Sequence, residues 1–166
     1  MLINYDIRTE HRLAVLASVD MVNAVTRKDL HRATPCEGWD LSQLLAHMTV
    51  QHRGFAAAAR GEGADPTRWD AATVTDAVVA DPAGAYSTAA TDVLDAFVDD
   101  GVLDESVARP EFGPGAAFPG SQAIGFHFVD YVVHGWDVAR TIDKPFTLPA
   151  GTRVDEPAWL VRARRV

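Results

Sequence analysis

The segment AIGFHFVDYVVHGWDVARTI, residues 123–142, is the most apolar helical stretch of this 166-residue chain. Apolar side chains point in nearly every direction around a helix with this sequence, so we expect it to be largely buried. The exceptions are four polar residues within one arc of roughly 80° on a helical wheel: His127, Asp130, His134 and Asp137. A narrow polar stripe on an apolar helix either meets solvent or lines a polar cavity.

Two features of this stripe favour the cavity. Solvent-facing stripes usually carry Lys, Glu or Arg, whereas this one carries only His and Asp. Asp130 and His134 are an i, i+4 pair, about 6 Å apart along the axis, so both side chains can converge on one ion. Histidine with carboxylate is an ordinary ligand set for zinc and other divalent metals. His127 is about 10 Å from His134 along the axis, so a third ligand must come from another helix.

Helical periodicity dominates the rest of the chain. The second helix has a sharp start, because Asp40 followed by Gln43 matches the capping-box pattern. Proline and glycine separate the helical stretches. We therefore predict four helices, at about residues 8–31, 40–60, 83–100 and 120–142.

Four helices of this length predict an all-α protein with a four-helix bundle over residues 1–145. We expect residues 146–166 to form a C-terminal tail. Residues 61–83 are predicted to be loop with a short helical turn near 73–80. Residues 101–119, rich in Pro and Gly, form an irregular connection of a length that is uncommon unless functional.

The second predicted helix offers two histidines as the third ligand, His47 and His52. On a helical wheel His52 lies near the centre of the apolar face, and His47 lies at its flank beside Gln51. Periodicity does not choose between them and, if anything, buries His52. A lone histidine on such a face is most often a core residue hydrogen-bonded to a backbone carbonyl.

Composition excludes several classes of function. A net charge of −8 without an internal basic cluster argues against nucleic-acid binding. The one basic run, Arg162 to Arg165, is expected to be a solvated tail. No apolar run approaches the roughly 20 residues of a membrane span, and the N-terminus has no apolar signal core. Cys36 is the single cysteine, so no intramolecular disulfide can form. We expect a cytoplasmic protein.

Two segments carry a resemblance to a known family. TPCEGWDLSQLLAHM (34–48) and VDYVVHGWDVAR (129–140) are similar to signature segments of the mycothiol-dependent maleylpyruvate isomerase-like proteins, within the DinB/YfiT-like metal-binding superfamily. The resemblance implies a DinB-like up-down-down-up four-helix bundle with a metal in a polar pocket. It also implies that the metal ligands are His47, Asp130 and His134. One departure is that the characterised isomerase has Glu at the Asp130 position, and Asp is one methylene shorter.

Three protein ligands without cysteine leave coordination positions for water or substrate, as catalytic metal sites do. We therefore expect a divalent-metal-dependent transferase or isomerase that acts on a small molecule with a thiol. Zinc is the expected ion and nickel the alternative, and mycothiol is the thiol that the resemblance implies. The rival hypothesis is a non-catalytic metal- or small-ligand-binding bundle with a stress or regulatory role. Relatives commonly form dimers through bundle faces, so we also expect a homodimer.

Several other residues carry weaker expectations. Cys36 is expected to be structural, and Trp39 and Trp136 are expected to pack in the core. Gly135, inside a helix, suggests close helix approach or ligand access. Partners for the metal-binding imidazoles are sought at His127, Gln51 and Asp137. Three arginines could bind a substrate carboxylate, and the sequence favours none of them: Arg53, Arg60 and Arg140.

Overall fold

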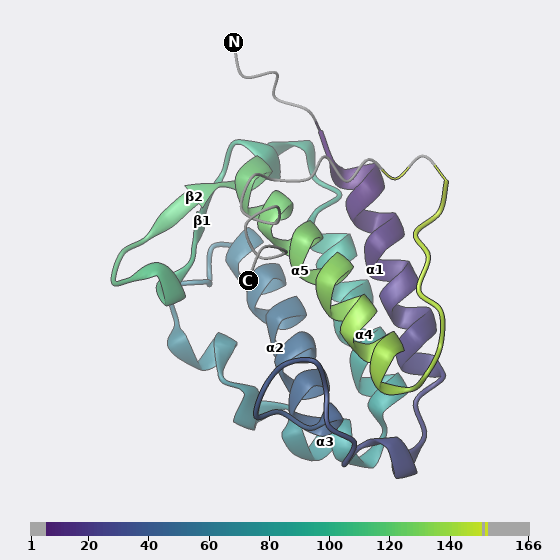
Figure 1. Ribbon diagram of the computed structural model, residues 1–166. Helices are drawn as coiled ribbons and strands as arrows, with labels where there is room; N and C mark the ends of the chain where they lie inside the picture. The colour runs from purple at the N-terminus through teal and green to yellow at the C-terminus, as the bar shows by residue number, and fades with distance from the viewer. Residues whose placement is uncertain (1–5, 151, 153–166) are drawn as a thin grey trace.

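The computed structural model describes residues 6–150 and 152. Its main elements are four long helices packed into one bundle (Figure 1), namely α1 (Arg8–Asn23), α2 (Leu41–Ala59), α4 (Pro82–Ala96) and α5 (Gly120–Thr141). A shorter helix, α3 (Thr75–Ala80), precedes α4. The prediction of an all-α bundle is confirmed. None of the described helices is both long enough and apolar enough to cross a membrane.

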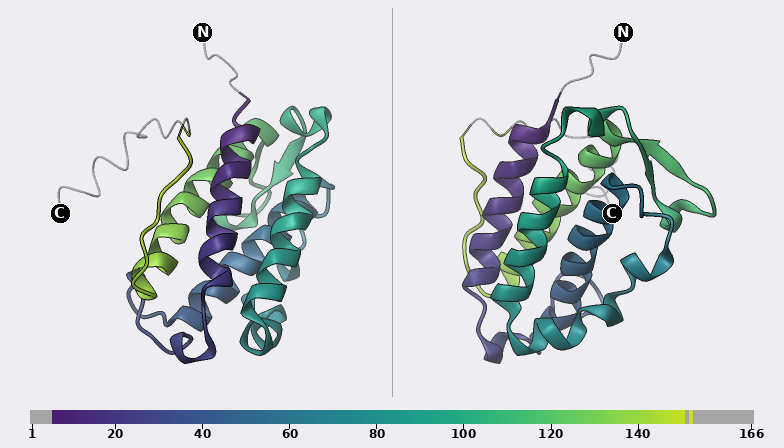
Figure 2. Two further views of the ribbon diagram at one scale, coloured as in Figure 1. Left: turned by 90° about the vertical axis from the view of Figure 1, so that its right-hand side faces the viewer. Right: turned by 180° about the vertical axis from the view of Figure 1, so that it is seen from behind.

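The bundle has the up-down-down-up topology. Helices α1 and α5 run in one direction, and α2 and α4 run in the other (Figure 1). Figure 2 shows α1 between α5 and α4, while α2 packs against α4 and α5 on the other side. The topology depends on the connection 60–81, which returns the chain to the end of the bundle where α2 began. As a result, α2 starts at the same end of the bundle at which α5 finishes.

Local signals explain where α2 begins and where α1 ends. At the start of α2, the Asp40 carboxylate accepts from the Gln43 amide at 3.0 Å, and the Gln43 side chain accepts from the Asp40 amide at 2.9 Å. The predicted capping box is therefore present. The first helix ends at Asn23 rather than near residue 31. Thr26 is extended there and forms its own capping box with Asp29, which begins a 3-10 turn at Arg27–Asp29.

The long connection before α5 contains structure that the sequence did not predict. Strand β1 (Ser106–Ala108) pairs antiparallel with β2 (Ala117–Pro119), with Val107 opposite Phe118. Strands of three residues are too short to show an alternating pattern. Three phenylalanine rings pack over this hairpin and the start of α5, with centroids 5.2 to 5.7 Å apart: Phe112, Phe118 and Phe126.

Three expectations about single residues and the tail can be compared with the structure. Trp39 and Trp136 are 38% and 47% exposed, so the prediction that they pack in the core is wrong. A Cβ at Gly135 would lie 2.7 Å from Cζ of Phe146, so the chain after α5 folds back closely over this glycine. Of the predicted tail, residues 146–150 and 152 are described and contain no helix or strand. The C-terminal arginines lie outside the described residues.

Candidate metal site

Two of the three predicted metal ligands are in contact. His47 from α2 and His134 from α5 meet edge to face, with ring centroids 5.4 Å apart and an interplanar angle of 83°. Asp130 lies one turn before His134 on α5 and is partly buried, like both histidines. Burial raises the pKa of the Asp130 carboxyl, and the interaction with His134 opposes that effect. The fold thus places the histidine that the family resemblance selected on α2 against His134, with Asp130 one turn earlier on α5.

The electrostatic state of the site suits metal binding. Burial lowers the pKa of His47 to about 4, and repulsion from a charged His134 acts in the same direction. At neutral pH His47 is therefore uncharged and has a free lone pair, the state that a metal ligand needs. Burial raises the pKa of Asp130, and His134 and Arg109 only partly offset that effect. A half-buried carboxylate with a raised pKa gains from a nearby cation.

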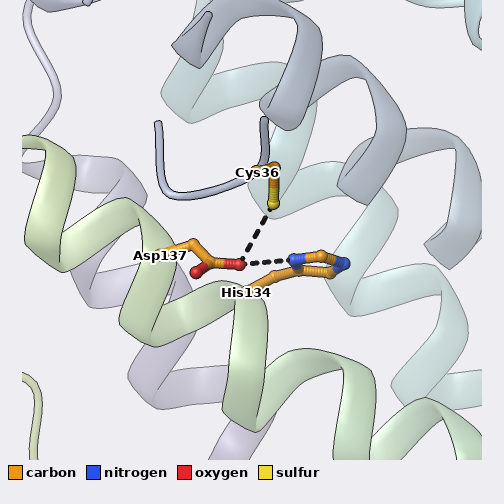
Figure 3. A group of neighbouring side chains, drawn as sticks. All are labelled: Cys36, His134 and Asp137. Atoms are coloured by element: carbon orange, nitrogen blue, oxygen red, sulfur yellow. Dashed lines mark hydrogen bonds and ion pairs between the residues drawn. The ribbon is translucent and has the colours of Figure 1, made fainter. Parts of the chain in front are cut away.

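His134 is oriented by a neighbour on its own helix. Its Nδ1 lies 2.9 Å from Oδ2 of Asp137, a carboxylate that is 4% exposed (Figure 3). An ionised carboxylate only accepts hydrogen bonds, so Nδ1 donates this bond and the neutral form of the ring has its lone pair on Nε2. Asp137 is one of the three predicted partners. Gln51 is buried, and its Oε1 has no hydrogen-bond partner within the described part of the chain.

Cys36, in the loop before α2, donates its S–H to the same Asp137 oxygen at 3.4 Å (Figure 3). Burial and the Asp137 charge raise the pKa of the thiol to about 11, so it stays protonated at neutral pH. A protonated, hydrogen-bonded thiol is a poor nucleophile. Cys36 was expected to be buried, and the structure leaves it partly buried with its thiol bonded to Asp137. No pattern along the chain predicts its contact with α5, which follows from α2 starting where α5 ends.

Cys36, His134 and Asp137 also form a compact set, each with one ligand atom within 4.8 Å of the others. A metal held by this set would take Nδ1 of His134, whereas a metal held with His47 and Asp130 would take Nε2. The first arrangement requires a thiolate from a thiol whose pKa is raised, and it requires breaking both hydrogen bonds to Asp137. The second keeps both of those hydrogen bonds. A metal held by His47, Asp130 and His134 would therefore need no thiolate.

Two further histidines, His52 on α2 and His127 on α5, lie in the core. His52 Nδ1 is 3.2 Å from His127 Nε2, and His127 Nδ1 is 2.8 Å from His11 Nε2 on α1. We call His11, His127 and His52 the histidine chain. Tyr131 stacks on His52 and His127 at 4.0 and 4.2 Å between centroids.

Burial keeps the whole histidine chain uncharged. It lowers the pKa of His11 to about 3 and the pKa values of His52 and His127 well below their usual range. His52 is a core histidine, as its place on the wheel indicated, but it bonds another imidazole rather than a carbonyl. His127 was predicted as a partner of the metal-binding imidazoles, and that prediction is wrong. Its two ring nitrogens are both engaged by other core histidines.

Trp39 lies beside the site. Its ring centroid is 5.0 Å from that of His47, at an interplanar angle of 52°. The rings of Trp39 and His134 thus both contact the ring of His47. Trp39 is therefore a partly exposed neighbour of the candidate ligand His47.

Comparison with known proteins places the chain in a family. Residues 11–139 match the model of the mycothiol maleylpyruvate isomerase N-terminal domain. The fold resembles the crystal structure of the mycothiol-dependent maleylpyruvate isomerase, with a TM-score of 0.66 and 16% identity over 82% of this chain and 61% of that one. A histidine-to-alanine mutant of that enzyme gives a TM-score of 0.61 and 13% identity over the same shares. No curated protein matches the chain.

The chain therefore spans less than two thirds of the isomerase that it resembles. The family model, in contrast, covers most of the chain and includes both signature segments apart from the last residue of the second. On that evidence the protein belongs to the mycothiol maleylpyruvate isomerase N-terminal domain family.

Proposed function

We propose that this protein binds one divalent metal ion through His47, Asp130 and His134 and uses it to activate a small-molecule thiol. The reaction would be a transfer or isomerisation of the mycothiol-dependent type. The observation that carries the proposal is the edge-to-face approach of His47 and His134 from two helices, with His134 held by Asp137. Zinc is the expected ion, and nickel is the alternative.

Each residue has a distinct role in this proposal. His47 and His134 would supply nitrogen ligands, and Asp130 would supply an oxygen ligand. A bound ion would lower the pKa of a coordinated thiol and so make a thiolate available near neutral pH. Asp137 holds the His134 ring in the tautomer that leaves Nε2 free. Cys36 stays protonated and does not compete with the substrate thiol.

Metal content of the purified protein tests the site. We expect one zinc ion for each chain in the wild type and loss of that stoichiometry in His47→Ala, Asp130→Ala and His134→Ala. The helical circular dichroism signal should remain, because the ligands lie at an open site rather than in the core. His31→Ala is the matched control, because the His31 side chain is 88% exposed.

Two further variants distinguish the possible ligand sets. His52→Ala and Cys36→Ser should both keep the metal. Metal lost with His52→Ala and kept with His47→Ala would show that the wrong histidine was assigned. Metal lost with Cys36→Ser would favour the set of Cys36, His134 and Asp137.

A thiol-conjugation assay tests catalysis separately from metal binding. The zinc-loaded protein should conjugate mycothiol to members of a panel of small electrophiles, and His134→Ala should not. A protein that binds zinc but conjugates nothing would be a non-catalytic metal-binding bundle, the rival hypothesis. We also propose a homodimer in the cytoplasm. Light scattering that gives the monomer mass across micromolar concentrations would contradict the dimer.

A further inference from the structure

A cavity of about 530 Å³ lies between α2, α4 and the connection 60–81. Three cationic and two anionic side chains line it, and they are Arg53, Arg60, Arg68, Glu62 and Asp92. The whole chain, in contrast, has a net charge of −8. The cavity therefore has an excess of positive charge on a protein that is negative overall, and such a cavity attracts anions.

The cavity is separate from the candidate metal site. Arg53 is six residues after His47 on α2, which places it about 9 Å further along the helix axis and about 120° around it. None of the described residues that line the cavity is a proposed metal ligand. A ligand in this cavity would therefore contact a different face of α2 from the one that bears His47.

The wall of the cavity that the connection forms is fixed against α2. The ring of Trp69 packs on Gly54, where an added Cβ would overlap the ring. Nε1 of Trp69 also donates to the carbonyl oxygen of Gly63 at 2.9 Å. Arg53 and Arg68 each directly precede one partner of the contact between Trp69 and Gly54. This contact therefore fixes the backbone from which both arginines extend into the cavity lining.

Most guanidinium N–H groups of the three arginines make no hydrogen bond within the described residues. Nη2 of Arg60 pairs with Asp92 at 2.8 Å, and Nη2 of Arg68 pairs with Glu62. Arg53 has no ion pair in the part of the chain that the structure describes. The four paired side chains are 45% to 56% exposed. Ion pairs this exposed contribute little to stability, so a ligand anion can take the place of either carboxylate at little cost.

We propose that this cavity binds a dianionic phosphate group through Arg53, Arg60 and Arg68. A phosphate group carries close to two negative charges at neutral pH and has three acceptor oxygens, so it can pair with several guanidinium groups at once. A carboxylate has one charge and two oxygens, and the chain already supplies two such partners in the cavity. The volume leaves room for a small organic group beside the phosphate. This site goes beyond the proposed function and does not depend on the metal.

Calorimetric titration of the full chain at low ionic strength, with inorganic phosphate and with glycerol phosphate, tests the site. Both probes should bind at one site for each chain. Acetate, with a single charge, should bind at least about tenfold more weakly. Tighter binding of glycerol phosphate would identify a small phosphate monoester as the ligand, and equal binding of the two probes would show that the cavity recognises the phosphate group alone.

Variants of single residues assign the binding to the cavity. Arg53→Met should weaken phosphate binding by about tenfold, because it removes one charge-assisted hydrogen-bonded pair. Arg12→Met is the matched control, since Arg12 is an exposed arginine on α1 that does not line this cavity. It causes the same change in net charge and should bind phosphate as the wild type does. Asp92→Asn releases Arg60, so phosphate should bind severalfold more tightly, which a purely structural ion pair would not produce.

Four results would overturn the proposal. The first is a wild-type chain that binds neither phosphate probe, and the second is acetate binding as tight as phosphate binding. The third is an equal loss in Arg53→Met and Arg12→Met, because phosphate would then respond to net charge alone. The fourth is loss of phosphate binding in His134→Ala, which would place the phosphate on the metal. If His134→Ala loses zinc and keeps phosphate, the two sites are independent, so either can fail without the other.

Discussion

Replacing Asp137 by asparagine should weaken zinc binding by about tenfold, although Asp137 would not touch the ion. Its Oδ2 accepts from His134 Nδ1 at 2.9 Å and from Cys36 Sγ at 3.4 Å. Asparagine has nearly the same shape, and its carbonyl oxygen can accept both bonds. The substitution therefore keeps the orientation of His134 but removes the negative charge that makes its imidazole a stronger base. A tenfold loss corresponds to about 1.4 kcal/mol.

Asp137→Ala should have the larger effect, about a hundredfold or roughly 2.7 kcal/mol. With no acceptor at this buried position, the His134 ring can rotate and can place its proton on Nε2, the nitrogen proposed to bind zinc. Cys36→Ser keeps a donor toward the carboxylate and should leave zinc affinity unchanged. The loss of zinc affinity should therefore be largest in Asp137→Ala, smaller in Asp137→Asn and absent in the control Cys36→Ser.

Competition with a chromophoric zinc chelator near neutral pH measures these affinities, and circular dichroism shows whether each variant is folded. Wild-type affinity in a folded Asp137→Ala variant would refute the reasoning, because His134 would then not depend on this carboxylate. A loss in Cys36→Ser as large as that in Asp137→Asn would also refute it, since Cys36 would then act as a ligand.

Three further predictions concern stability. The histidine chain should make the free energy of unfolding fall as pH drops below about 6.5, by up to about 1.4 kcal/mol per pH unit for each histidine. The pKa values of these histidines in the folded state, about 3 for His11, lie below the unfolded value, so the unfolded chain binds more protons in that pH range. An unchanged free energy of unfolding in urea melts between about pH 7 and about pH 5 would contradict this prediction. Gly120→Ala should destabilise by about 1–3 kcal/mol in thermal melts because its Cβ would overlap the Val102 carbonyl oxygen. Gly125→Ala, with nothing within 4 Å, should instead stabilise by up to about 1 kcal/mol, and equal melting temperatures for the two variants would exclude the packing argument. Tyr86→Phe should cost about 1 kcal/mol in denaturant melts, because it removes a buried hydroxyl 2.7 Å from Ser18 Oγ, and an unchanged midpoint would show that this bond contributes nothing.

The helices could be predicted from the sequence because their signals are local. The capping box of Asp40 and Gln43 lies within one turn, and the apolar periodicity of α5 lies within one helix. The early end of α1 also has a local signal, since Thr26 and Asp29 show the pattern of a second capping box. The prediction of a helix to about residue 31 followed the apolar periodicity alone. The hairpin before α5 had no comparable signal, because each strand has only three residues.

The sequence pattern predicted only those candidate ligands that lie on a single helix, α5. Asp130 and His134 followed from their spacing on α5, but the choice of His47 over His52 needed the family resemblance. Both histidines lie on or beside the apolar face of α2, and only the position of α5 decides which of them meets His134. Cys36 lies in a connection whose course depends on tertiary packing, so no spacing along the chain indicated its contacts.

The polar stripe of α5 is two features with different physical causes. A neutral imidazole costs little to bury once both its nitrogens are bonded, so His127 can lie in the core between two other histidines. A carboxylate costs far more, so Asp137 is buried only with His134 and Cys36 hydrogen-bonded to it, whereas Asp130 stays partly exposed and burial raises its pKa. The helical wheel groups these residues because it records direction alone. The cost of burying charge separates them, and it leaves the part of the stripe that contains Asp130 and His134 as the part suited to hold a cation.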